Sequence, residues 1–246
     1  MKNRAIGIIV AAVFSFTGMF TACKTSPQTE DPDFLGNYPP QSLGVAHLNI
    51  VKRYSSTLIP RNISFVFDPK TNTVKFHHKL MGDNIWVYLS KENRQLLREG
   101  IERYLAAFKA KTLTQEGSKK KGSFGKTDVL VTWGLAGSAH QAYPTLRFDY
   151  QFITPQRPYF ILANATVKGS DDANCPAMRI AISPAQCQDM LGIIDEQALS
   201  ALIDELRSDY DKFDITENGG TVKDIEDNAQ ESDDPAKEEE IVFDTF

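Results

Sequence analysis

The fold is indicated most clearly by the stretch Ile85-Trp86-Val87-Tyr88-Leu89-Ser90, which leads directly into a helical sequence beginning at Lys91. Apolar residues at every second position are typical of a strand with one buried face. Serine is a preferred residue at the N-terminal cap of a helix. The same order recurs at Met178-Arg179-Ile180-Ala181-Ile182-Ser183, where Pro184 suits the first helical turn. The chain is therefore predicted to contain two strand-to-helix transitions.

Working outward from these transitions, similar β-rich stretches predict eight strands. They cover residues 45–51, 63–67, 73–80, 85–89, 129–135, 146–152, 159–167 and 178–182. Helices are predicted from Ser90 to about Lys111 and in two stretches after Ser183. We expect an α+β domain over residues 44–214, with a mainly antiparallel sheet of seven or eight strands and helices on one face. Two βββα-like units and a single undivided sheet are both compatible with this pattern.

Composition sets the limits of this domain. Residues 24–43 are rich in Thr, Ser, Pro, Gln and Asp, which predicts a flexible tether. Residues 215–246 contain eleven acidic residues against Lys223 and Lys237, which predicts an acidic disordered tail. Because the tail holds the acidic excess, the body is nearly neutral, and generic nucleic-acid binding is excluded.

The N-terminus has the features of a targeting signal. Lys2 and Arg4 precede an uncharged apolar run that ends at Cys23, an order typical of secretory signals. Phe20-Thr21-Ala22-Cys23 resembles the lipobox of bacterial lipoproteins. The resemblance implies a signal peptide over residues 1–22, a diacylated Cys23 at the start of the tether (23–43), and a lipid-anchored place in the bacterial cell envelope. Ordinary secretion and an uncleaved anchor are the alternatives.

In that compartment, the two remaining cysteines form a candidate disulfide between Cys175 and Cys187. Two buried free thiols are the alternative. The disulfide would close a short loop and stabilise the fold by about 3 kcal/mol on the chain-entropy model.

Residues that could carry chemistry do not form a recognised motif. Gly122-Ser123-Phe124-Gly125-Lys126-Thr127 ends like a phosphate-binding loop, but a helix precedes it and a strand follows, which is the wrong order. The lysine run 119–121 before it is interpreted as a solvated loop and a weak patch for anionic headgroups. His77 and His78 point to opposite faces of one strand, so they cannot share a metal ion. No cofactor and no metal are predicted.

Two other patterns are candidates. Ser138 and His140 lie close together in a loop of small residues, and Arg147 and Asp149 share one strand face as a predicted charge pair. Five aromatic residues are either an exposed face for a ligand or partner, or core beneath the helices. They are Trp133, Phe148, Tyr150, Phe152 and Tyr159.

We expect a non-catalytic binding or scaffolding module whose partners are the membrane, through the lipid, and an envelope protein or apolar ligand. A carrier of an apolar ligand such as a lipid and an envelope hydrolase are the alternatives.

Overall fold

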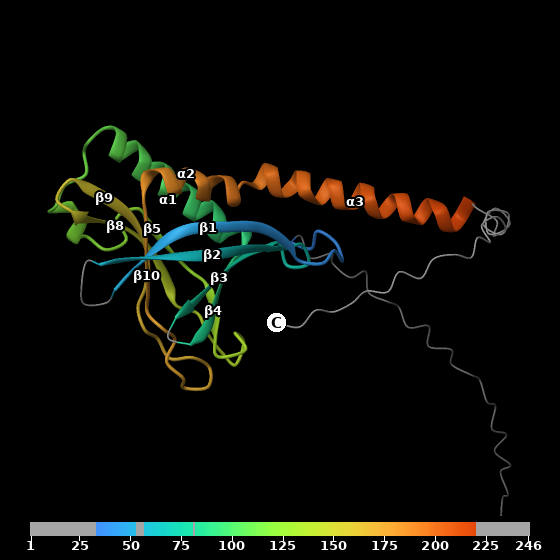
Figure 1. Ribbon diagram of the computed structural model, residues 1–246, viewed down its shortest axis with the longest axis horizontal. Helices are drawn as coiled ribbons and strands as arrows, with labels where there is room; N and C mark the ends of the chain where they lie inside the picture. The colour runs from blue at the N-terminus through green and yellow to red at the C-terminus, as the bar shows by residue number, and fades with distance from the viewer. Residues whose placement is uncertain (1–32, 53–56, 81, 220–246) are drawn as a thin grey trace, which may run out of the picture. The chain divides into compact units, whose positions relative to one another are not determined.

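The computed structural model describes residues 33–52, 57–80 and 82–219 (Figure 1). The signal peptide, Cys23, most of the tether and the acidic tail beyond Gly219 lie outside these residues. The elements are β1 (Gln41–Val51), β2 (Leu58–Asp68), β3 (Thr73–Leu80), β4 (Asp83–Leu89), α1 (Lys91–Lys109), the 3₁₀ turn η1 (Gly117–Lys119), β5 (Gly125–Asp128), β6 (Leu130–Trp133), β7 (His140–Ala142), β8 (Thr145–Thr154), β9 (Arg157–Asn164), β10 (Met178–Ile182), α2 (Pro184–Ile193) and α3 (Glu196–Gly219).

The sheet is antiparallel, as predicted, but has ten strands among the described residues rather than seven or eight. Their order is β5-β8-β9-β10-β1-β2-β3-β4-β6-β7. β5 and β6 are separated only by Val129, whose N–H donates to Pro144 O at 3.2 Å between β7 and β8. The segment β5–β6 is thus paired along its length with the segment β7–β8, as one long hairpin. Because β5 and β7 are the two ends of the strand order, the sheet curves into a half-barrel.

Both predicted strand-to-helix transitions are confirmed. Ser90 caps α1 and Ser183 caps α2, and in each case the side chain at the third helical position bonds back to the serine N–H. These residues are Asn93 and Gln186. Reciprocal bonding of this kind satisfies two backbone donors that a helix start otherwise leaves unpaired.

The helices do not form the single clear layer that the sequence suggested. α1 contacts β4, β5, β8 and β9, whereas α2 contacts β1, β9 and β10. Near the start of α3, Leu199 and Ile203 are buried, and the helix then continues past Asp214 to Gly219. The sheet is thus the dominant element of the fold.

Aromatic side chains fill the interior between the sheet and the helices. The most deeply buried rings are Phe65, Phe67, Phe76, Tyr104, Phe148 and Phe160, each at most 2% exposed. Tyr104 connects α1 to the sheet, because its ring packs on Phe160 and its hydroxyl donates to Pro158 O at 2.8 Å. Dense packing of this kind is what a domain of this size needs for a stable core.

Arg94 of α1 is the largest fully buried side chain among the described residues. Its guanidinium donates to Asn72 O at 2.7 Å, to Asn72 Oδ1 at 2.8 Å and to Leu89 O at 3.2 Å, and its Nε lies 2.6 Å from Glu196 Oε1. The charge is therefore balanced, and one side chain joins the β2–β3 turn, α1 and the start of α3.

Candidate anion-binding site

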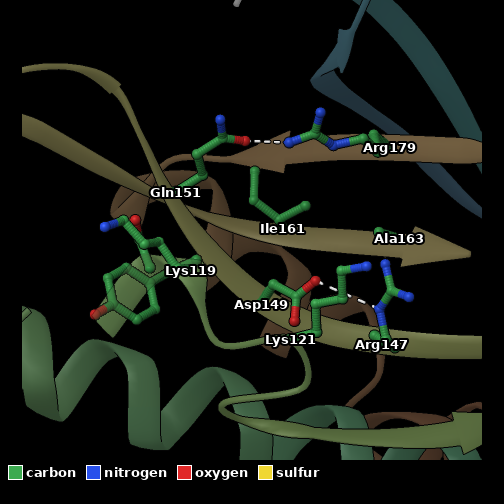
Figure 2. A pocket seen from close by; sticks show the side chains of 10 residues that line it. Lys119, Lys121, Arg147, Asp149, Gln151, Ile161, Ala163 and Arg179 are labelled. Atoms are coloured by element: carbon green, nitrogen blue, oxygen red, sulfur yellow. Dashed lines mark hydrogen bonds and ion pairs between the residues drawn. The ribbon is translucent and has the colours of Figure 1, made fainter. Parts of the chain in front are cut away.

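Two arginines flank an alanine in one row across three strands. Arg147 of β8 and Arg179 of β10 are both paired in register with Ala163 of β9. Neighbouring strands lie about 4.8 Å apart, so the two arginine backbones are about 10 Å apart, with only a methyl group between them. The two side chains leave this row in different directions: Arg179 extends to Gln151, and Arg147 lies beside Asp149 (Figure 2).

Two polar residues of β8, Asp149 and Gln151, contact the two arginines. Arg147 Nε lies 3.6 Å from Asp149 Oδ2, an ion-pair distance too long for a hydrogen bond, and this buried Nε has no hydrogen-bond partner. Arg179 donates to Gln151 Oε1. The predicted pairing of Arg147 with Asp149 is confirmed, and the guanidinium of Arg147 keeps unused hydrogen-bonding capacity.

The lysine run belongs to the same site because β8 holds the loop that contains it. Tyr150 accepts from the Thr114 N–H at 3.3 Å and donates to Thr114 O at 2.9 Å, and Gly117 leaves room for its hydroxyl. Asp149, which points to the opposite face of β8, accepts from the Gly122 N–H. The loop is thus tied down on both sides of Lys119 and Lys121.

These residues enclose a pocket of about 450 Å³ on the outer face of the sheet. Its lining residues are Ser118, Lys119, Lys121, Arg147, Asp149, Tyr150, Gln151, Ile161, Ala163 and Arg179. We call it the cationic pocket, because it combines four basic side chains with one carboxylate over an apolar floor of Ile161 and Ala163. In Figure 2 the side chains of Lys121 and Arg147 point toward one another.

Lys119 also pairs with Glu116 at 2.7 Å, but both side chains are more than 70% exposed. An ion pair so exposed to solvent contributes little and exchanges readily for another anion. Arg147 and Asp149, with exposed fractions of 28% and 14%, are much less exposed than that pair. Fixed, partly desolvated cations of this kind attract anions more strongly than solvated ones.

Most of the aromatic residues considered as a ligand face are core. Trp133, Phe148 and Tyr150 are 3%, 0% and 5% exposed, and Phe152 is partly buried against the same cluster. Tyr159 lies on the other side of the sheet, where it packs on the small cluster around Ile161 and Ala163. Trp133, Phe148 and Tyr150 therefore belong to the core and do not form an exposed face, whereas Phe152 and Tyr159 are partly buried on opposite sides of the sheet.

The histidines are distributed over separate places. His78 is 1% exposed and neither ring nitrogen has a hydrogen-bond partner, and burial with the charge of His77 lowers its pKa to about 4. His140 bonds to Asp171 through Nδ1 and lies against Trp133, and this hydrogen bond lowers the pKa of Asp171. Among the described residues, no cluster of three or more His, Cys, Asp or Glu side chains is placed to hold a metal ion.

The predicted disulfide is not formed in the structure. Cys175 and Cys187 are buried free thiols, and burial raises their pKa values to about 11 and about 12. Cys175 precedes β10 and Cys187 follows it in α2, whereas bridged cysteines have Cα atoms within about 7 Å. All of β10 lies between them, so a short separation in sequence does not by itself bring the two sulfur atoms together.

Sequence reasoning missed Arg179 and Ala163 as site residues. The alternation in β10 does place Arg179 on the outer face, away from Met178, Ile180 and Ile182. No local signal in the sequence shows that Arg179 and Arg147 share one face of the sheet, because β9 lies between their two strands.

In the part of the chain described here, no helix is both long and apolar enough to cross a membrane. No solved structure matches the chain. Residues 40–201 match the family model described as "Uncharacterised Treponema protein". An uncharacterized protein of Treponema pallidum (strain Nichols) is 42% identical over 226 residues, which cover 92% of this chain and 80% of the relative. The matched residues include every strand of the half-barrel and all lining residues of the cationic pocket, and the chain belongs to this family of Treponema proteins.

Proposed function

We propose that the protein is a lipid-anchored component of the cell envelope whose half-barrel domain binds an anionic ligand in the cationic pocket, without a catalytic role. The observation that carries the proposal is that Lys119, Lys121, Arg147 and Arg179 all line one pocket. These residues come from a loop and two non-adjacent strands, so the cluster is a product of the fold.

The anchoring part of the proposal rests on the lipobox-like Phe20-Thr21-Ala22-Cys23. A signal of this kind would place Cys23 first in the mature chain, with a polar segment between the lipid and β1. Metabolic labelling with a palmitate analogue tests it. Label is expected on the wild-type chain and not on Cys23→Ala, and label that persists on the variant would rule the anchor out.

A carrier of apolar ligands has less support. Such a protein needs an open apolar cavity, whereas rings such as Phe67, Phe148 and Phe160 fill the space between sheet and helices. The cationic pocket instead has an apolar floor and a basic rim, which suits a charged group.

The hydrolase alternative has one observation in its favour. Asp171 orients His140 through Nδ1, which is the arrangement that prepares a histidine as a general base. Hydrolysis also needs a nucleophile within hydrogen-bond reach of the other ring nitrogen, and no hydrogen bond joins Ser138 to His140. A hydrolytic activity that disappears in His140→Ala would favour this alternative over a binding module.

Isothermal titration calorimetry with acetate, succinate, sulfate and inorganic phosphate at constant ionic strength tests the binding function. At least one anion is expected to bind the wild-type protein and to lose affinity in the double variant Arg147→Gln/Arg179→Gln. Arg207→Gln is the matched control, because Arg207 is an exposed α3 residue paired with Asp204. Equal binding by the double variant and the wild type would refute the proposal.

A further inference from the structure

The cationic pocket has a charge and a shape that restrict the kind of anion it can hold. Four cations and one carboxylate, Asp149, line the pocket, an excess of about three positive charges, and Glu116, which pairs with Lys119, lies outside this lining. A monovalent anion would leave most of this excess unbalanced. A dianion balances more of the excess positive charge, and binding it orders the same side chains at the same entropic cost.

The directions of the donors add a geometric restriction. Arg147 lies beside Lys121, which reaches it from the loop, and Arg179 extends past Ile161 to Gln151 at another side of the pocket (Figure 2). A carboxylate has two oxygens in one plane and can satisfy one guanidinium fork at a time. A tetrahedral phosphate has three terminal oxygens, which can meet two forks and an ammonium group together.

From these features, and on the basis of the anion-binding function proposed above, we infer that the cationic pocket holds the dianionic phosphate of a phosphate monoester. The apolar floor of Ile161 and Ala163 lies beneath the phosphate, and the partly exposed guanidinium of Arg147 faces it, with the buried Nε held beside Asp149. The ester can belong to a soluble molecule or to a lipid headgroup, since the same terminal phosphate occurs in both.

Ala163 distinguishes a shaped pocket from a merely basic surface. Its side chain is 2% exposed and lies between the two arginines, so Ala163→Val fills the space over the floor without changing any charge. Attraction to a basic surface would survive this change. Binding of a phosphate against the floor of the pocket would not.

The experiment is calorimetric titration of the full chain with glycerol 3-phosphate, with succinate as the carboxylate dianion, in matched salt. We expect the wild type to bind succinate at least about tenfold more weakly than glycerol 3-phosphate. The variants Arg147→Gln, Arg179→Gln and Ala163→Val are each expected to lower the affinity for glycerol 3-phosphate by about tenfold or more, which is the value of one charge-assisted contact. Urea unfolding of each variant shows whether the fold is retained, and Ala163→Ser replaces Ala163→Val if it is not.

The pH dependence provides an independent readout. The second pKa of a phosphate monoester is about 6, so its affinity is expected to fall between pH 8 and pH 5 as the dianion is protonated. Sulfate stays a dianion over this range and serves as the constant reference. The charged groups that face the ligand are Lys119, Lys121, Arg147, Arg179 and Asp149, and no histidine lines the pocket.

The outcomes separate the two proposals. Succinate that binds as tightly as glycerol 3-phosphate, or unchanged phosphate affinity in Ala163→Val, overturns the phosphate inference and leaves anion binding intact. No binding of any anion by the wild type overturns both. Flotation with phosphatidylcholine vesicles, with and without phosphatidic acid, then identifies the source of the phosphate: capture only with phosphatidic acid indicates a lipid headgroup, and glycerol 3-phosphate binding without capture indicates a soluble ester.

Discussion

Lowering the pH from 7 to 4 is expected to destabilise the fold through His78. This side chain is 1% exposed, lies opposite Ile85 in the β3–β4 pairing and has no hydrogen-bond partner at either ring nitrogen. Burial, with a smaller contribution from His77, lowers its pKa from 6.5 to about 4. The folded protein therefore holds a neutral ring where the unfolded chain would bind a proton.

The sign and the size of the effect follow from this difference. The stabilising contribution is fully present above the unfolded pKa of 6.5 and is lost as the pH falls toward the folded pKa. Each pKa unit corresponds to about 1.4 kcal/mol, so the loss at pH 4 is about 3 kcal/mol. Carboxylates with lowered pKa values, such as Asp171 and Asp195, also weaken the fold in acid, so a variant must isolate His78.

His78→Leu removes the titrating ring and keeps an apolar side chain in the core. Urea unfolding at pH 7, 6, 5 and 4 should show the stability of the variant relative to the wild type rising by about 3 kcal/mol toward pH 4. His47→Gln is the control, because His47 is exposed and should leave the profile unchanged. If wild type and His78→Leu lose the same stability between pH 7 and pH 4, His78 is not the buried neutral group described here.

Two further predictions concern the interior. Arg94→Ala should lower the free energy of unfolding by about 3 to 5 kcal/mol, because it leaves Glu196 and the carbonyl of Asn72 without their partner; a loss under about 1 kcal/mol in urea unfolding would contradict this role. Cys175 and Cys187, whose pKa values are raised by burial, should resist iodoacetamide at pH 8 in the native protein and both react in denaturant, as peptide mapping would show. Labelling that requires prior reduction would instead indicate the disulfide.

Local sequence signals predicted those elements whose stability is local. β3 was expected over residues 73–80 and is found there, and Ser90 and Ser183 cap helices because the third helical residue completes each capping box. β5, in contrast, has the sequence Gly-Lys-Thr-Asp, with no apolar residue to mark it. It is a strand because it pairs with β8, from Gly125 opposite Phe148 to Asp128 opposite Thr145.

The candidate site was only half visible in the sequence. The lysine run and the pair Arg147 and Asp149 stood out separately, and alternation correctly placed the pair on the face opposite the aromatic row. Alternation shows that a strand has two faces, but not which of them the rest of the chain covers. The register that brings Arg179 opposite Ala163 depends on pairing between β9 and β10 across a loop, which no local pattern encodes.

The pairing of β1 with β10, with Asn49 opposite Ala181, determines when the fold can be completed. Until the last strand has left the ribosome, one edge of β1 exposes unpaired backbone groups that can recruit a strand from another chain. Contacts between segments so distant in sequence also slow folding, because most of the chain must be ordered before they form. Premature termination before β10 therefore leaves a chain prone to aggregation rather than a smaller working domain.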